Sequence, residues 1–322
     1  MKTLLYSTAH FFVDLCSALL IFRYCTGGDW MITLLLYNFC AFALQLPFGI
    51  LADRLDRNAG VAGLGMMLTA LSFLSGGHLW GVILCGCGNA LFHIGGGIEI
   101  LNRSVHKAIR LGIFVAPGAL GLYIGTQWGQ GKLPLWFLPL LLGAFGLFLL
   151  LFNRKPSGNT LPELPRLSPA LLSLFGVVVL RSYLGFCMVF SWNDGMLTGL
   201  LLVFAIVLGK IAGGWLLDRL GYLPAALLSL LPAAGLLFFP QWMVFGLFGV
   251  FFFQMTMPMT LWAAAKACPG AKGFSFGLLT FALFLGFLPI LFGLRLPADR
   301  ILLALGTLFS LLLLICGRRC GS

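Results

Sequence analysis

Charged residues are scarce in this sequence: Asp, Glu, Lys and Arg together make up 9% of its 322 residues, and nine residues are acidic. A soluble globular domain has about a quarter of its residues charged, so this composition excludes an ordinary soluble domain. The net charge of +11 does not indicate a nucleic-acid partner, because no soluble domain is available to present a basic face. Hydrophobic residues make up 60% of the chain. We therefore expect an integral membrane protein in contact with a lipid bilayer.

Long polar stretches are also rare, and the apolar residues form continuous runs. Runs of about 20 residues predict membrane-spanning helices and argue against a closed β-barrel. The first run carries Asp14 and has no small-residue cleavage pattern after it, so we interpret it as a span and not as a signal peptide. The sequence predicts an all-α membrane protein with twelve transmembrane helices, near residues 3–25, 30–52, 59–76, 79–101, 108–128, 134–152, 168–191, 196–217, 222–239, 241–264, 272–294 and 299–317.

Lys and Arg are distributed unevenly between the two sides of these spans. If the N-terminus is cytoplasmic, fourteen lie on the inner side and four on the outer side, namely Arg23, Lys132, Arg295 and Arg300. Positive charge concentrates in cytoplasmic loops of membrane proteins. We therefore expect both termini to be cytoplasmic. We also expect a monomeric multi-pass protein of the bacterial cytoplasmic (inner) membrane.

The nine cysteines do not form a pattern that indicates a disulfide framework or a metal site. Most lie within predicted spans, and the spacing of Cys85 and Cys87 places them on different faces of a helix. We interpret the cysteines as buried inert thiols, and we expect no cofactor and no metal.

One pattern occurs twice: residues 49–55 read GILADRL and residues 214–220 read GWLLDRL. The same offset of 165 residues relates Lys107 to Lys272, Gly112 to Gly277 and Gly121 to Gly286. Matches at one spacing across several spans predict two six-helix halves in the same orientation. We expect an N-terminal bundle over 1–155, a cytoplasmic linker over 156–167 and a C-terminal bundle over 168–322. Such parallel repeats bind their cargo between the halves, near the membrane midplane.

The duplicated loop resembles the signature loop of the major facilitator superfamily, and twelve spans in two halves is the layout of that family. Within it, AHFFVD (9–14), GCGNALFHIGGG (86–97) and RLGIFVAPGALGLYIG (110–125) resemble the fosmidomycin-resistance type of drug exporter. The resemblance implies a secondary transporter that works by alternating access, with drug efflux by antiport.

The duplicated loop also has a physical interpretation. Gly49 and Gly214 allow neighbouring helices to approach closely, and Asp53 and Asp218 can accept hydrogen bonds from the free amides of a helix N-terminus. Asp56 ends the first loop where Gly221 ends the second, and aspartate tolerates a left-handed backbone better than most residues. The alternative is that the loops only supply inward-facing positive charge. The resemblance implies a conformational latch made of Gly49, Asp53, Arg54, Gly214, Asp218 and Arg219.

Six ionisable residues fall inside predicted spans, where a charge costs on the order of 3 kcal/mol. The offset of 165 pairs His10 with Phe175, Asp14 with Val179, His93 with Pro258 and Arg181 with Cys16. These four ionisable residues are therefore not mirrored by the repeat. A residue needed only to hold one half together would be expected in both halves. All six are therefore candidates for a functional role: His10, Asp14, His93, Glu99, Arg181 and Lys210.

Ser7, His10, Asp14 and Ser17 follow a three-or-four spacing and form one polar stripe on the first span. Asn89 and His93 lie one turn apart in the fourth span and are expected to form a second wall of the same substrate cavity. A buried carboxyl can exchange a proton, and imidazole titrates near neutrality. The sequence therefore predicts that Asp14 and His10, with Glu99, couple proton passage to transport. The alternative is a static hydrogen-bonded tether between helices, and for Glu99 an ion pair with Arg103.

Arg181 and Lys210 supply positive charge from the second half, and we place them in the cavity together with Gln254. They could neutralise Asp14 or Glu99 in one access state, or meet an anionic group of the cargo. Gln254 opens the run QMTMPMT, which could suggest a copper-conducting thioether ladder. A helix sends the three methionines to different faces, so an adaptable lining for apolar cargo is the preferred interpretation.

The fifth span is rich in glycine and carries a proline. It resembles the motif of exchangers in this superfamily, where a bend and close packing limit leakage through the central path. Glycine and proline are also common in membrane helices in general. The residues of this helix-5 motif are Gly112, Pro117, Gly118, Gly121 and Gly125.

The sequence thus predicts a secondary transporter that moves a small organic molecule, with proton-coupled efflux as the preferred direction. The first alternative is a proton-coupled or facilitative importer. An intramembrane acyltransferase-like enzyme would suit His10 and Asp14, but no adjacent second histidine and no HExxH motif accompany them. We expect no enzymatic activity, and a membrane scaffold or receptor would not need the unmirrored charges.

Overall fold

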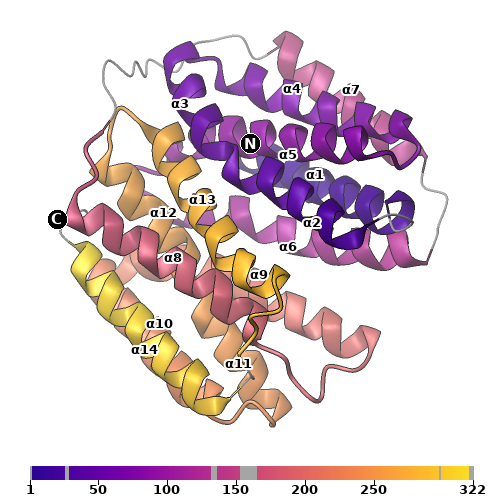
Figure 1. Cartoon of the computed structure of the whole chain (residues 1–322). Coiled ribbons are helices and arrows are strands. Elements are labelled where there is room, and N and C mark those ends of the chain that lie inside the picture. Colours follow the sequence, from indigo (N-terminus) through magenta and orange to yellow (C-terminus); the bar gives the residue numbers. More distant parts are fainter. Residues whose placement is uncertain (1, 26–28, 132–135, 153–164, 297–298, 319–322) are drawn as a thin grey trace. The chain divides into compact units, whose positions relative to one another are not determined.

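The computed structural model describes all residues except 1, 26–28, 132–135, 153–164, 297–298 and 319–322 (Figure 1). Every regular element among the described residues is a helix. The first nine elements are α1 (Lys2–Tyr24), α2 (Trp30–Asn38), the π-helical η1 (Phe39–Ala43), α3 (Gln45–Leu55), α4 (Asn58–Leu71), the 3-10 helix η2 (Ser72–Ser75), α5 (Leu79–Arg103), α6 (Ile109–Gln130) and α7 (Phe137–Phe152). The others are α8 (Pro169–Cys187), α9 (Met196–Leu220), α10 (Tyr222–Leu237), α11 (Met243–Gln254), α12 (Thr256–Ala267), α13 (Lys272–Leu291) and α14 (Arg300–Gly317).

The prediction of an all-helical chain is confirmed for the described residues. Ten helical stretches of the described chain are long and apolar enough to cross a membrane. They coincide with ten of the predicted spans. The other two predicted spans, 134–152 and 222–239, coincide with shorter apolar helices, Phe137–Leu151 and Tyr222–Leu237. A count of twelve spans in two repeats therefore stays a prediction.

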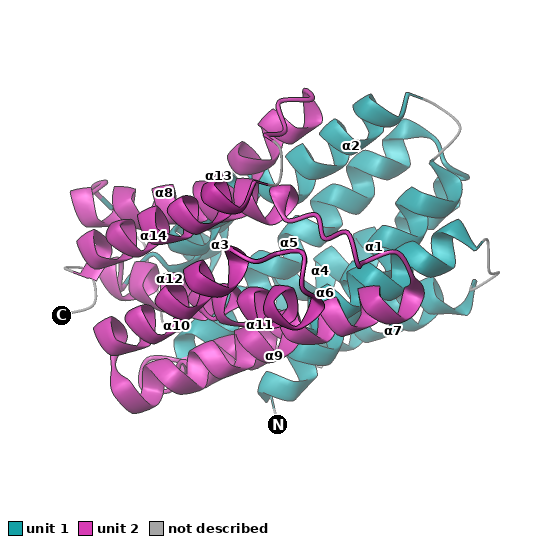
Figure 2. Cartoon of the chain, turned by 90° about the horizontal axis from the view of Figure 1, so that it is seen from below, with its two compact units in different colours: residues 1–102, 117–165, 270–281 teal, residues 103–116, 166–269, 282–322 magenta. Residues whose placement is uncertain are grey.

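The chain divides into two compact units (Figure 2). Unit 1 comprises residues 1–102, 117–165 and 270–281, and unit 2 comprises residues 103–116, 166–269 and 282–322. The helices α6 and α13 each contribute a segment to both units. The expected boundaries at 155 and 168 stay a prediction, and most of the expected linker, 156–167, lies outside the described residues.

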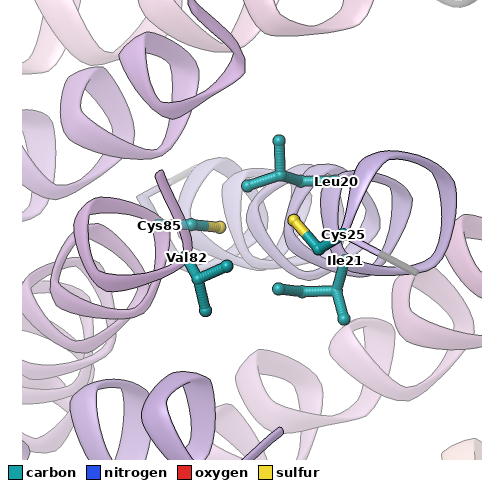
Figure 3. Packing of buried hydrophobic residues seen from close by; sticks show 5 residues of the cluster. All are labelled: Leu20, Ile21, Cys25, Val82 and Cys85. Atoms are coloured by element: carbon teal, nitrogen blue, oxygen red, sulfur yellow. The ribbon is translucent and has the colours of Figure 1, made fainter. Parts of the chain in front are cut away.

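Apolar contacts between the end of α1 and α5 form part of the core of unit 1 (Figure 3). Leu20 and Ile21 pack with Val82 and with two buried thiols, Cys25 and Cys85. Six of the eight described free cysteines are buried, as the sequence predicted, whereas Cys87 is partly exposed and Cys316 is exposed.

Glycines determine how closely α4 and α5 approach in unit 1. A Cβ atom at Gly65 would overlap the backbone of Gly88 and Phe92 on α5. The two helices therefore touch backbone to backbone, which any larger residue would prevent. Asn89 and His93, the two predicted cavity residues of α5, lie on this same stretch of the helix.

Replacing Gly65 by alanine is predicted to destabilise the protein, because the methyl group would have to push two helices apart. Overpacking of this kind costs about 1 to 3 kcal/mol. The matched control is Gly60→Ala on α4, where the nearest atom to the new methyl, Leu150 Cδ1, is 3.9 Å away. Thermal unfolding in detergent should show a lower midpoint for Gly65→Ala and an unchanged or higher midpoint for Gly60→Ala. Equal midpoints for the two variants would contradict this packing.

Candidate functional site

The polar stripe of α1 divides into two parts. Ser7 donates a hydrogen bond to the backbone oxygen of Thr3, at 2.7 Å, so its hydroxyl is bound within its own helix. His10, Asp14 and Ser17 lie further along the helix and contact side chains of α5, all within unit 1. The predicted stripe is present, and its last three members form the site.

Asp14 is the centre of this group. Its Oδ2 atom lies 3.1 Å from His10 Nε2. Its Oδ1 atom accepts a hydrogen bond from Asn89 Nδ2 at 3.0 Å and lies 3.7 Å from His93 Nε2. Asn89 Nδ2 also lies 3.3 Å from Ser17 Oγ. We call these five residues the Asp14 cluster, and they come from α1 and α5 as the sequence predicted.

The hydrogen bonds of the histidines limit where the protons are. His93 Nδ1 lies 2.9 Å from the backbone oxygen of Asn89, and since a carbonyl oxygen only accepts, this nitrogen carries a proton. In neutral His93 the Nε2 atom then has a free lone pair, and it faces His10 Nε2 at 2.8 Å. Two nitrogens this close need a proton between them, so His10 Nε2 donates. The same nitrogen also faces Asp14.

One proton on His10 is therefore shared between an imidazole and a carboxylate. With both histidines neutral and Asp14 ionised, the Asp14 cluster carries one net negative charge. An added proton makes one imidazole cationic beside the carboxylate and cancels that charge. His10 is buried, and 19% of the side chain of Asp14 is exposed. The cluster can thus hold or release a proton in a largely apolar surrounding.

The glycines of α6 press this helix onto α1 within unit 1. A Cβ atom at Gly118 would overlap His10 Nε2 and Asp14 Oδ2, and one at Gly121 would overlap the backbone oxygen of Phe11. Gly125 likewise leaves room only for the backbone of Leu15. The sequence indicated a bend and close packing in this helix. It did not indicate that Gly118 lies against the ionisable pair, because spacing alone does not show which helices are neighbours.

His10, Asp14 and His93 could also offer three ligand atoms to a metal ion, since these atoms lie within 4.8 Å of one another. Two imidazoles and a carboxylate suit several divalent transition metals. In the structure, however, the same atoms are engaged in hydrogen bonds with one another and with Asn89. The expectation that the protein holds no metal stays a prediction.

Four other predicted site residues lie on α5, α8, α9 and α11. Glu99 is buried on α5, six residues beyond His93 or about 9 Å along the helix axis. Arg181 and Lys210 are buried in unit 2, and Gln254, the last residue of α11, is partly exposed there. Whether Ser7, Gln254 and these charged residues line one cavity with the Asp14 cluster stays a prediction.

The two signature aspartates each accept a pair of backbone hydrogen bonds at the start of a helix. Asp53 on α3 accepts from the amides of Gly273 and Phe274 in the first turn of α13, both at 2.8 Å, within unit 1. Asp218 on α9 accepts from the amides of Ala108 and Ile109 at the start of α6, at 2.6 and 2.9 Å, within unit 2. An aspartate in this position complements the positive end of the helix dipole.

These contacts repeat with the offset of the sequence. The acceptors, 53 and 218, and the first donors, 108 and 273, are each 165 residues apart. Gly49 packs against Gly273, and Gly214 packs against Ala108 and Ile109, with no room for a Cβ atom at either glycine. The duplicated motif therefore describes a duplicated contact, made once in each unit.

The other residues of the predicted motifs are placed as follows. Arg54 and Arg219 are exposed, and Arg219 lies 6.0 Å from the ring centroid of Trp215. Gly112 packs against the backbone of Lys210 in unit 2. Asp56 is the one non-glycine residue with positive φ in the described chain, at φ 47°, as expected for an aspartate at the end of the first loop.

No protein-family model matches the sequence, and no curated protein matches it. Solved structures share its fold at low identity. The Escherichia coli fucose:proton symporter FucP, named in one structure as a major facilitator superfamily transporter in the outward conformation, has a TM-score of 0.66 and 13% identity, covering 99% of this chain and 98% of that chain. The human organic anion transporter MFSD10 has a TM-score of 0.66 and 16% identity, covering 98% and 99%. A bacterial homologue of the iron transporter ferroportin has a TM-score of 0.60 and 12% identity, covering 99% and 98%.

The chain therefore has the fold of major facilitator superfamily transporters. Together with its apolar helices, this makes it a multi-pass membrane protein. The likeness is at the level of the fold and assigns no substrate.

Removing the carboxylate of Asp218 is predicted to weaken unit 2, because two amides at the start of α6 lose their acceptor. Loss of such a cap costs about 1 kcal/mol. Asp218→Ala should lower the thermal unfolding midpoint in detergent. Asp194→Ala is the matched control, since it removes the same charge from an exposed residue of unit 2. If both variants unfold at the wild-type temperature, the amides of Ala108 and Ile109 do not depend on Asp218.

Proposed function

We propose that the protein is a secondary active transporter that moves a small organic molecule by alternating access and couples this movement to protons. The observation that carries the proposal is the Asp14 cluster, a carboxylate held between two imidazoles in an apolar helix bundle. The fold supports it, since the fold neighbours are transporters, among them a proton symporter and an organic anion transporter. Two six-helix halves and twelve spans belong to this proposal, as does a monomer in the bacterial inner membrane with both termini cytoplasmic.

Proton exchange follows from the shared proton on His10. When a proton binds, the Asp14 cluster becomes neutral, and when it leaves, the cluster carries a negative charge that the apolar surrounding disfavours. Conformations that open the cluster to opposite sides of the membrane would then differ in proton affinity. Glu99, buried on the same helix, is proposed as a further member of the proton path.

The duplicated aspartate contacts are proposed to act as the conformational latch. Asp53 and Asp218 hold the first turns of α13 and α6, the two helices that contribute to both units. Breaking either pair of hydrogen bonds would free a helix start to move. Arg54 and Arg219 are exposed, so we assign the latch to the carboxylates and glycines before the arginines.

We propose efflux by antiport as the direction, of the fosmidomycin-resistance type. The close packing of α6 on α1 at Gly118 and Gly121 supports a path that protons cross only through the Asp14 cluster. Import is the second candidate, because a symporter has this fold. An acyltransferase-like reaction is the least supported, since the fold neighbours are transporters.

Asp14→Asn is predicted to abolish proton coupling, because an amide cannot take up or release the proton. In liposomes with an imposed pH gradient, fosmidomycin should drive proton release by the wild-type protein, and Asp14→Asn should reduce that release by about tenfold or more. Asp194→Asn, an exposed carboxylate of unit 2, is the matched control and should behave as wild type.

The thermal unfolding midpoint of each variant separates loss of coupling from loss of folding. Transport by a folded Asp14→Asn variant at the wild-type rate and with the wild-type pH dependence would show that the coupling proposal is wrong. Binding of fosmidomycin without any proton movement in the wild type would point to the facilitative alternative.

A further inference from the structure

Arg181 is a buried guanidinium in the middle of an apolar helix. It lies twelve residues after the start of α8 and six before its end, or about 18 Å and 9 Å along the axis. Only 7% of its surface is exposed. A long cationic side chain near a membrane surface usually extends its charge to water. Arg181 instead turns inward, toward the start of α12.

The guanidinium has few hydrogen bonds for its capacity. Its five N–H groups can all donate, yet within the described residues its hydrogen bond is a single long one, from Nη1 to Thr256 Oγ1 at 3.5 Å. That hydroxyl donates in turn to the backbone oxygen of Phe253, at 2.9 Å. Thr256 therefore presents oxygen lone pairs to Arg181, and most of the donors of the guanidinium face other directions.

Unit 2 offers no buried carboxylate to balance this charge. Its three acidic residues, Asp194, Asp218 and Asp299, are all exposed, and two of them accept hydrogen bonds at helix starts. A second buried cation, Lys210 on α9, lies in the same unit and donates to the backbone oxygen of Val115 at 3.2 Å. The described interior of unit 2 thus carries two cationic side chains and no anionic one.

The helix next to Arg181 is interrupted at this level. Met255 separates α11 from α12, and Gly213 of α9 leaves room only for the backbone of Met255. Thr256 is the first residue of α12, so the hydroxyl that meets Arg181 stands at the interruption. Interruptions of this kind in membrane helices occur where the backbone lies against protein or a binding cavity.

We propose that Arg181 and Thr256 form an anion-binding site in unit 2, which takes the carboxylate or phosphonate group of an organic cargo. A planar guanidinium binds both groups through two parallel hydrogen bonds, and Thr256, whose hydroxyl accepts from Nη1, helps to orient the guanidinium. The inference rests on the proposed transport function and specifies its substrate class. Lys210 strengthens the positive potential of the unit.

Equilibrium binding tests this site without any transport. The full-length protein in phosphatidylcholine nanodiscs is titrated with radiolabelled benzoate and phenylphosphonate, and with benzyl alcohol as the neutral analogue. We expect the two anions to bind and the alcohol not to bind. Arg181→Gln should weaken anion binding by about tenfold or more, Arg181→Lys by less, and Thr256→Val by a few fold. Arg166→Gln, an exposed arginine of unit 2, is the matched control and should bind as wild type.

Other results would overturn the proposal. Anion binding by Arg181→Gln at wild-type affinity would exclude Arg181 as the receptor. A second set of nanodiscs also contains phosphatidylglycerol. If the wild-type protein retains bound phosphatidylglycerol and Arg181→Gln loses it, while benzoate affinity is the same in both, the site holds a lipid phosphate.

Failure here is distinct from failure of the proposed function. If fosmidomycin drives proton release in liposomes and benzoate affinity is the same in wild type and Arg181→Gln, only the anion site is contradicted. Benzoate binding through Arg181 without proton release under any gradient contradicts proton-coupled transport alone. If Arg181→Gln does not fold, Arg181→Lys preserves the charge and decides the same question, because a single ammonium cannot replace the two parallel hydrogen bonds.

Discussion

A charge inside an apolar helix bundle needs a partner, and this requirement explains most of what is unusual in the chain. In unit 1 the carboxylate of Asp14 is met by an amide and two imidazoles, which lets it exist with or without an added proton. In unit 2 the guanidinium of Arg181 has one weak partner and no buried carboxylate. The first arrangement is suited to moving protons, and the second to receiving an anion.

Glycine supplies the close contacts that make the first arrangement possible. Gly65 brings α4 against the backbone of α5, which carries Asn89 and His93, and Gly118 brings the backbone of α6 against His10 and Asp14. Backbone this close leaves little space for water on that side of the pair. In the proposed function the protonation of the pair is tied to the positions of the helices, which is the property that coupling requires.

Much of this could be predicted from the sequence. The three-or-four spacing of His10, Asp14 and Ser17 and the one-turn spacing of Asn89 and His93 placed these side chains on two facing stripes. The offset of 165 residues identified Asp53 and Asp218 as helix-capping residues. The sequence did not indicate which helix starts they cap, that Gly118 touches the ionisable pair, or that Thr256 meets Arg181, because periodicity describes one helix and not its neighbours. It also did not predict that α6 and α13 contribute to both units.

In the proposed function, Asp14 exchanges a proton as part of one network with His10 and His93. Infrared difference spectroscopy between acidic and alkaline pH, on the full-length protein in nanodiscs, measures carboxyl protonation without any substrate. We expect a carboxyl band that disappears in Asp14→Asn and titrates at a different pH in His93→Gln, while Asp194→Asn leaves it unchanged. A spectrum that is the same in wild type and Asp14→Asn would show that Asp14 does not exchange a proton.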